Sequence, residues 1–125
     1  MKKVLIAEDD PNLAKYLLTV LSYLKCETEV VNNGKKAISK GATFQPHVAL
    51  LGVVMPEMGG VEAAIELPRV STATKVVFIS ESVPEATLAH LKSQGYNFRT
   101  LGAPFTLEEL REAIFGDLGE DRRAE

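Results

Sequence analysis

The fold of this chain is constrained most by a fivefold alternation of short, mostly apolar runs with longer segments of helical period. The runs lie at Val4–Ala7, Thr28–Val31, Val48–Leu51, Val76–Ile79 and Phe98–Leu101. Between them apolar residues recur three or four positions apart, as Leu13, Leu17 and Leu21 do, which is the spacing of one helix face. Parallel strands that alternate with helices need right-handed crossovers. The pattern therefore predicts a doubly wound α/β domain, with a parallel sheet covered by helices on both faces.

The character of two runs predicts where they lie in the sheet. Val48–Leu51 is unbroken and apolar, which is typical of a strand covered on both faces of a parallel sheet. Thr28–Val31 is more polar, as suits an edge strand. We therefore expect the third run at the centre of the sheet and the second at an edge.

Several local signals mark where helices begin and end. They are Asp10-Pro11, the capping-box pairs Ser82 with Glu85 and Thr106 with Glu109, and Pro68. An Asp side chain accepts hydrogen bonds from free amides at a helix start, and proline suits the first turn. The two pairs have the spacing of a reciprocal cap. Pro68 predicts that the helix containing Val61 and Ile65 ends at about Leu67.

Composition favours one compact domain and excludes two classes of partner. With 125 residues and 46% hydrophobic content, the chain fits a single core. Its 14 basic residues are dispersed and the net charge is -3, which argues against nucleic-acid binding. No apolar run approaches the length of a membrane span, and Met1-Lys2-Lys3 leads directly into a strand pattern, so we expect a cytoplasmic protein without a membrane contact.

The domain is expected to cover residues 1–118, and residues 119–125 are expected to form a charged tail or the start of a linker. The apolar period fades from Gly116 onward, so the end of the chain contributes no core. The single cysteine, Cys26, cannot form an internal disulfide. It is interpreted as a buried structural thiol.

Candidate functional residues follow the strands, because ligands of such sheets bind outside the carboxyl ends of the strands. These positions hold Glu8, Asp9 and Asp10, then Gly52 through Pro56, then Ser80 and Glu81, and finally Gly102, Ala103 and Pro104. Acidic residues are concentrated after the first strand. The other ends carry no comparable cluster of chemical groups.

Three of these blocks carry a family resemblance. Val4–Leu13, Leu50–Gly60 and Pro104–Leu110 resemble the signature blocks of response-regulator receiver domains of two-component signalling, in the right order and spacing. The resemblance extends from about Lys2 to Leu118. It implies a flavodoxin-like (βα)5 fold, whose parallel five-stranded sheet has the order 2-1-3-4-5.

The resemblance also implies a phosphoryl-transfer site, of which this sequence holds only a part. In the family, an acidic pair helps to bind magnesium, an aspartate after the third strand takes the phosphoryl group, and a hydroxyl and a lysine contact that group. By position, the acidic pair is Glu8 and Asp9 and the hydroxyl is Ser80. The aspartate position holds Gly52 and the lysine position holds Ala103.

Two further departures concern switching. The residue after the hydroxyl, which is usually small, is Glu81, and the aromatic switch position of the fifth strand is Thr100. A threonine cannot swing a ring between buried and exposed positions, so coupling from Ser80 to the output surface is expected to be weakened.

These substitutions predict a receiver that is not an enzyme and is not phosphorylated at the usual position. Glycine has no side chain, so it can neither attack a phosphoryl group nor offer a carboxylate oxygen to magnesium, and Ala103 removes the fixed cation. A cavity is expected where the two side chains are missing. Crowding of Glu8 and Asp9 is expected to raise one pKa. A weak magnesium site at this pair and the backbone carbonyl of Val54 stays open, and no cofactor is required.

The favoured hypothesis is a constitutive protein-interaction module that uses the family's usual output surface, formed by the fourth helix, the fifth strand and the fifth helix. A homodimer stays open. The competing hypothesis is a receiver that binds an anion in the old pocket or accepts phosphoryl groups at another residue such as Asp10. Asp10 is, however, expected to cap a helix.

Other residues give no alternative catalytic constellation. Glu57 lies in a loop that is expected to be solvated. Ser80 lacks a base, because His47 precedes the third strand at the opposite end of the sheet and His90 lies within a helix. A flavin site on the same fold is poorly supported, since the loop after the first strand is acidic where a phosphate would need free amides.

Overall fold

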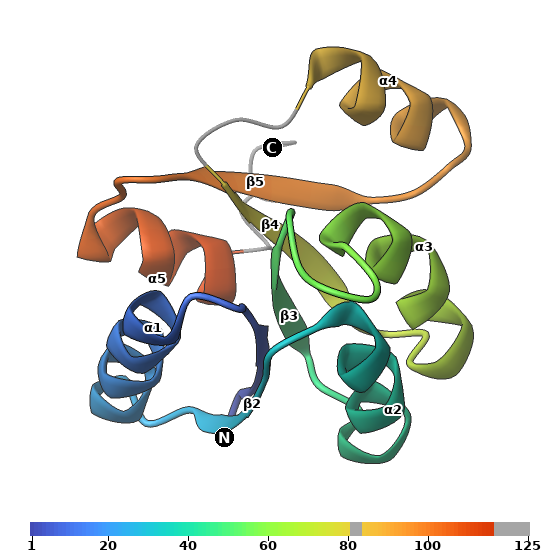
Figure 1. The fold of residues 1–125 in the computed structure, drawn as a ribbon. Coiled ribbons are helices and arrows are strands. Elements are labelled where there is room, and N and C mark those ends of the chain that lie inside the picture. The colour runs from blue at the N-terminus through green and yellow to red at the C-terminus, as the bar shows by residue number, and fades with distance from the viewer. Residues whose placement is uncertain (81–83, 117–125) are drawn as a thin grey trace.

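The computed structural model describes residues 1–80 and 84–116. Five strands alternate with five helices along the chain (Figure 1). Their bounds are β1 Lys3–Ala7, α1 Pro11–Tyr23, β2 Glu27–Val31, α2 Gly34–Phe44, β3 Val48–Gly52, α3 Gly60–Val70, β4 Lys75–Ser80, α4 Glu85–Ser93, β5 Phe98–Gly102 and α5 Leu107–Phe115. The predicted alternation is confirmed.

The strands form one parallel sheet in the order β2-β1-β3-β4-β5. The predicted order, the central place of β3 and the edge place of β2 are therefore confirmed. All five residues of β3 are buried, as expected for a strand covered on both faces. In the described part of the chain, β5 pairs with β4 alone and forms the second edge of the sheet.

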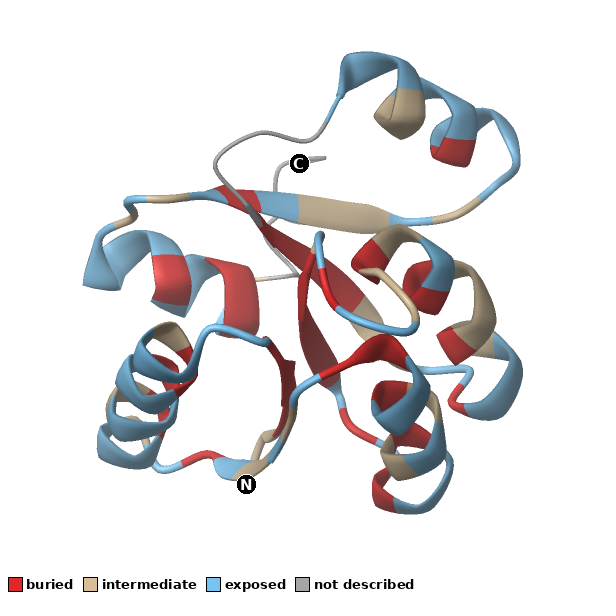
Figure 2. Cartoon of the chain, viewed as in Figure 1, coloured by how far each residue is buried: buried red, intermediate tan, exposed pale blue. Residues whose placement is uncertain are grey.

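Two apolar clusters lie on opposite faces of the sheet. Helices α1 and α5 cover one face, and α2 and α3 cover the other (Figure 1). Consecutive residues of one strand enter different clusters, as Leu50 and Leu51 of β3 do, because successive side chains of a strand point to opposite faces. The buried residues follow the sheet and the inner sides of the helices (Figure 2). Cys26 is buried in the first cluster.

Two helix starts form as their sequences predict. Asp10 caps α1, because its side chain accepts a hydrogen bond from the Asn12 amide at 3.0 Å. Thr106 and Glu109 form the reciprocal capping box of α5. These caps satisfy amides that have no partner within the first helical turn.

The structure corrects the predicted end of α3. The helix continues through Pro68 to Val70, and the Ser71 amide still donates to the Leu67 carbonyl at 2.9 Å. Within a helix a proline lacks one amide donor and its ring crowds the carbonyl four residues before it. Here that loss falls in the last turn, so the helix ends three residues later than the expected Leu67.

The start of α4 also differs from the expectation. The helix begins at Glu85, and Pro84 occupies the cap position without a side-chain cap. Ser82, the cap expected from the sequence, lies outside the described residues, as does the tail at 119–125. Among the side chains of α4, Leu91 is the buried one, so this helix has a small share in the core.

Candidate functional site

The site lies at the carboxyl ends of β1 and β3, beside the point where the strand order reverses. Glu8 follows β1 directly, and Gly52 is the last residue of β3. An ideal Cβ built on Gly52 would lie only 2.7 Å from Glu8 Oε1. The structure thus brings Glu8 against Gly52, the position that the family resemblance assigns to the phosphoacceptor. Where the sequence suggested a cavity beside Gly52, the carboxylate of Glu8 takes the space.

Glu8 is held in this position by burial and by one hydrogen bond. The residue is 9% exposed, and the Asp10 amide donates to its Oε2 atom at 3.1 Å. Burial raises the pKa of Glu8, and the neighbouring Asp9 raises this pKa further, while the Asp10 amide lowers it. The crowding of Glu8 and Asp9 predicts a raised pKa, and the larger cause in the structure is the burial of Glu8.

The two aspartates that follow differ from Glu8 in their surroundings. Asp9 and Asp10 are both exposed. Asp10 uses Oδ1 to cap α1 through the Asn12 amide, which is its expected structural role. The acidic triplet is therefore divided into one buried carboxylate, one exposed carboxylate and one helix cap.

The loop between β3 and α3 closes over the end of β3. The Gly60 amide donates to the Val53 carbonyl at 2.9 Å, and a Cβ at Gly60 would collide with the Gly52 carbonyl. Val54 is 83% exposed, and Glu57 adopts a positive φ of 66°. The loop backbone thus lies directly against the candidate site, while the Val54 side chain points into solvent.

The ends of β4 and β5 carry the remaining positions that the sequence singled out. Ser80 ends β4 and pairs with Gly102 of β5; the side chain of Ser80 and the whole of Glu81 lie outside the described part. Ala103 is half-buried just after β5. Thr100 is exposed and lines a hollow against α4.

Two histidines lie away from the site. His47 Nδ1 accepts a hydrogen bond from the Lys3 amide at 2.9 Å, at the end of the sheet opposite to Glu8. His90 is exposed on α4. Neither is placed to act as a base at the carboxyl ends of β1 and β3.

One residue of the site region was not found from the sequence. Lys36, in the first turn of α2, lines a hollow of about 550 Å³ together with Glu8 and Asp9. The sequence shows only a lysine soon after Asn33-Gly34, and a helix-start lysine is normally a solvated side chain. Its position beside the acidic pair depends on how α2 packs against β1, which a single sequence does not display.

The donor set suits a tightly bound magnesium ion poorly. Across residues 1–80 and 84–116, no group of three or more His, Cys, Asp or Glu side chains is arranged to hold a metal. Glu8 is turned toward Gly52 and already accepts from the Asp10 amide. Of the two exposed aspartates beside it, Asp10 is engaged as the cap of α1. Magnesium prefers near-octahedral oxygen ligands and keeps several waters. As they stand, these residues do not fit a closed magnesium site.

None of the helices within the described ranges combines the length and the apolar character that crossing a lipid bilayer requires.

Comparison with known proteins identifies the scaffold. The family model of the response regulator receiver domain matches residues 4–115. The regulatory protein AtoC of Escherichia coli is 30% identical over 111 residues, which is 88% of this chain and 24% of AtoC. The chain thus spans about a quarter of the length of that relative. The response regulator receiver protein CpdR of Brucella abortus is 28% identical over 114 residues, 91% of this chain and 94% of CpdR.

Solved structures agree with this fold. A CheY-like receiver domain protein from Methanospirillum hungatei superimposes with a TM-score of 0.84 at 18% identity, covering 100% of this chain and 99% of that one. The receiver domain of the sensor histidine kinase PA1611 from Pseudomonas aeruginosa, which has magnesium coordinated in its active-site cleft, gives a TM-score of 0.81 at 18% identity, with 94% and 98% coverage. With the match of the family model over most of its length, the chain belongs to the response regulator receiver domain family of two-component signalling.

Proposed function

We propose that this chain is an atypical receiver domain that is not phosphorylated at the usual position and acts as a constitutive protein-interaction module. The observation that carries the proposal is the end of β3, where Gly52 faces the Glu8 carboxylate. A phosphoryl acceptor is needed at this point in the family. Here the position has no side chain, and the adjacent space holds the carboxylate of Glu8, which follows β1 directly.

The chemistry of phosphoryl transfer supports the proposal. The transferred group needs a nucleophile and positioned cations that absorb the charge of its oxygens. Gly52 supplies no nucleophile and Ala103 supplies no cation. A family site with three aspartates and one lysine has a formal charge of 1 - 3 = -2, and Glu8 with Asp9 also gives -2. The paired loss leaves no lysine or third carboxylate without a partner.

Phosphorylation of Asp10 is the alternative, and its geometry is unfavourable. Asp10 Oδ1 accepts from the Asn12 amide and caps α1. Attack by this carboxylate would sacrifice the cap, which is worth about 1 kcal/mol. The alternative is retained as an outcome of the experiment below.

We propose that magnesium is not required and binds weakly at most. The PA1611 receiver holds magnesium in its cleft, which makes the ion the natural one to test. The protein ligands would be Glu8, Asp9 and the Val54 backbone carbonyl, with water completing the shell. Glu8 would have to leave its place beside Gly52 to take part.

The proposed interaction surface is formed by α4, β5 and α5, and its partner is a protein. Because Thr100 has no ring to move, the surface would not depend on a phosphorylation switch. The proposal includes no enzymatic activity, no nucleic-acid contact and no membrane contact; a homodimer through the same surface stays open. It keeps the cytoplasmic location and the division into residues 1–118 and a tail at 119–125 that the sequence suggested.

The experiment incubates four variants with a small phosphoryl donor and magnesium and records intact mass. The variants are wild type, Gly52→Asp, Ala103→Lys and the double variant. We expect no mass gain for wild type or Ala103→Lys, some acyl phosphate on Gly52→Asp, and faster transfer to the double variant. Magnesium titration of the same set should show tighter binding to Gly52→Asp than to wild type.

A stoichiometric, hydroxylamine-sensitive mass gain on wild type would overturn the proposal. Asp10→Asn would then test the alternative acceptor, because loss of the gain in that variant would assign phosphorylation to Asp10. If the folded double variant takes up nothing while wild type does, the acceptor position has been misidentified.

A further inference from the structure

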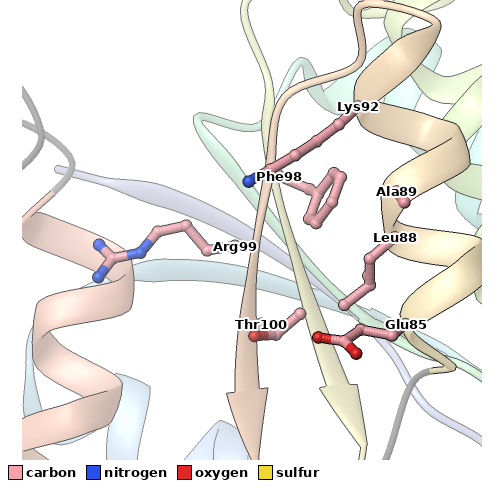
Figure 3. A pocket seen from close by; sticks show the side chains of 7 residues that line it. All are labelled: Glu85, Leu88, Ala89, Lys92, Phe98, Arg99 and Thr100. Carbon is pink, nitrogen blue, oxygen red and sulfur yellow. The ribbon is translucent and has the colours of Figure 1, made fainter.

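Strand β5 forms a free edge between two hollows of different character. It pairs with β4 and with no other strand in the described part of the chain. A hollow of about 710 Å³ separates it from α4, and a hollow of about 320 Å³ separates it from α5. Figure 3 shows β5 between these two helices. The unpaired amides and carbonyls of such an edge can pair with another chain.

The hollow on the α4 side has an apolar floor. Leu88 and Ala89 of α4 face Phe98 of β5 across it, and Glu85 and Lys92 lie at its ends (Figure 3). Leu88 and Phe98 are half-buried, and Ala89 is exposed. The opposite charges at the two ends leave the apolar middle as the part that can bind a side chain by removing it from water.

The hollow on the α5 side is acidic. Glu108, Glu109 and Glu112 of α5 line it. Its cation is Arg99 of β5, which points toward α5 (Figure 3) and donates to the Glu112 carbonyl at 3.1 Å. The Glu109 carboxylate is engaged in the cap of α5, whereas Glu108 and Glu112 are exposed. This side therefore favours a positively charged side chain.

We propose that the free edge of β5 binds an extended segment of a partner protein as a sixth strand, with apolar and basic residues in alternation. Successive side chains of a strand point to opposite faces. Those on the α4 side would meet Leu88 and Phe98, and those on the α5 side would meet Glu108 and Glu112. The inference rests on the proposed function, because it names the kind of partner that the interaction surface takes.

The length of β5 and its far end suit such an occupant. The strand has five residues, Phe98–Gly102, which matches an ordinary added strand. A Cβ built on Gly102 would have no heavy atom within 4 Å, so this end of the edge is open. Main-chain hydrogen bonds would supply affinity, and the two hollows would supply the sequence preference.

The experiment uses a capped synthetic peptide that alternates lysine with valine, at low salt, with the purified wild-type chain. We expect saturable binding in fluorescence anisotropy and slower hydrogen exchange of the β5 amides at residues 98–102. One control peptide has the same composition with its valines contiguous, and another carries N-methyl groups along one backbone edge. Both should bind at least about tenfold more weakly, because the first loses the alternation and the second the ladder.

Two double variants distinguish the local effect of the acidic hollow on peptide affinity from the effect of the net charge of the chain. Glu108→Lys with Glu112→Lys should weaken the alternating peptide about tenfold. Glu27→Lys with Glu62→Lys changes the net charge equally on surfaces away from β5, and affinity should change by less than about threefold. Equal losses in both would mean that only long-range charge is involved, and would overturn the proposal.

The proposal is also overturned if the N-methylated or contiguous peptide binds as well as the alternating one, or if the β5 amides gain no protection. If the chain alone sediments as a dimer with the same β5 protection, the occupant is a second copy and not a partner segment. None of these measurements needs a phosphoryl donor. Phosphorylation of wild type would thus refute the proposed function without touching peptide binding, and loss of peptide binding would leave the phosphorylation result standing.

Discussion

Replacing Gly52 by aspartate tests whether the Glu8 carboxylate occupies the space beside Gly52 that an aspartate side chain would need. The Cβ alone would come within 2.7 Å of Glu8 Oε1, so the Glu8 side chain must shift to admit any side chain. Two carboxylates in that space would be about 4 Å apart after relaxation, which corresponds to about 4 kcal/mol of repulsion at an effective dielectric constant of about 20. Movement of Glu8 or uptake of a proton relieves part of this.

Gly52→Asn is the matched control, because asparagine has the shape of aspartate without its charge. Both variants should be less stable than wild type in urea unfolding. At about pH 7.5, Gly52→Asp should be less stable than Gly52→Asn by about 2–4 kcal/mol. The difference should shrink at about pH 5, where one carboxyl of the pair takes up a proton, and also in the presence of millimolar magnesium.

Equal stability of the two variants at about pH 7.5 would refute the reasoning. It would mean that a carboxylate at position 52 does not meet Glu8, and that the Glu8 carboxylate does not occupy the space beside Gly52. A reduced m-value in either variant would signal a change in its folded or unfolded ensemble. The stabilities of the two variants would then be compared only at pH values where their m-values equal that of wild type.

Three further predictions concern stability. The pKa of Glu8 is raised in the folded chain, so the folded state binds the Glu8 proton more tightly than the unfolded state does. The contribution of Glu8 to stability is therefore most favourable below the ordinary pKa of 4.5 and falls as pH rises through the raised pKa. Glu8→Gln should remove that fall and be more stable than wild type at about pH 7.5 but not at about pH 4, as read from urea midpoints at both pH values. Thr106→Ala removes the side-chain half of the α5 capping box and should cost about 1 kcal/mol in urea unfolding, whereas Thr72→Ala at an exposed position should cost much less. Leu91→Ala removes the buried residue of α4, which is 1% exposed, and should cost about 2–5 kcal/mol by the same measurement; a smaller loss would show that α4 contributes little to global stability.

The sequence was sufficient for the sheet because its information is local and repeated. The unbroken apolar run at Val48–Leu51 is typical of a strand covered on both faces, and the structure places it at the centre. Caps at Asp10 and Thr106 depend on side chains close to the amides that they satisfy. Such short-range signals need no knowledge of tertiary packing.

The features that escaped prediction depend on contacts between distant segments. Pro68 was expected to end its helix, but α3 continues to Val70, the Ser71 amide still donates to the Leu67 carbonyl, and Leu67 is buried in the second apolar cluster. The proximity of Glu8 to Gly52 could be anticipated from the family resemblance, but the inward position of its carboxylate could not. That position follows from the absence of a side chain at Gly52 and from the amide of Asp10.

The contact between Gly60 and the end of β3 affects how chains of this kind are recognised. A Cβ at Gly60 would lie 2.9 Å from the Gly52 carbonyl carbon and closer still to its oxygen. The backbone path therefore excludes a side chain at position 60, independently of the chemistry of the neighbouring site. One glycine of the signature block is thus required by the crossing of two backbone segments. A motif fixed by sterics is readable in a sequence whatever the chemistry of the site. Detection of the family therefore reports the scaffold, and the side chains at the strand ends must be read separately for chemistry.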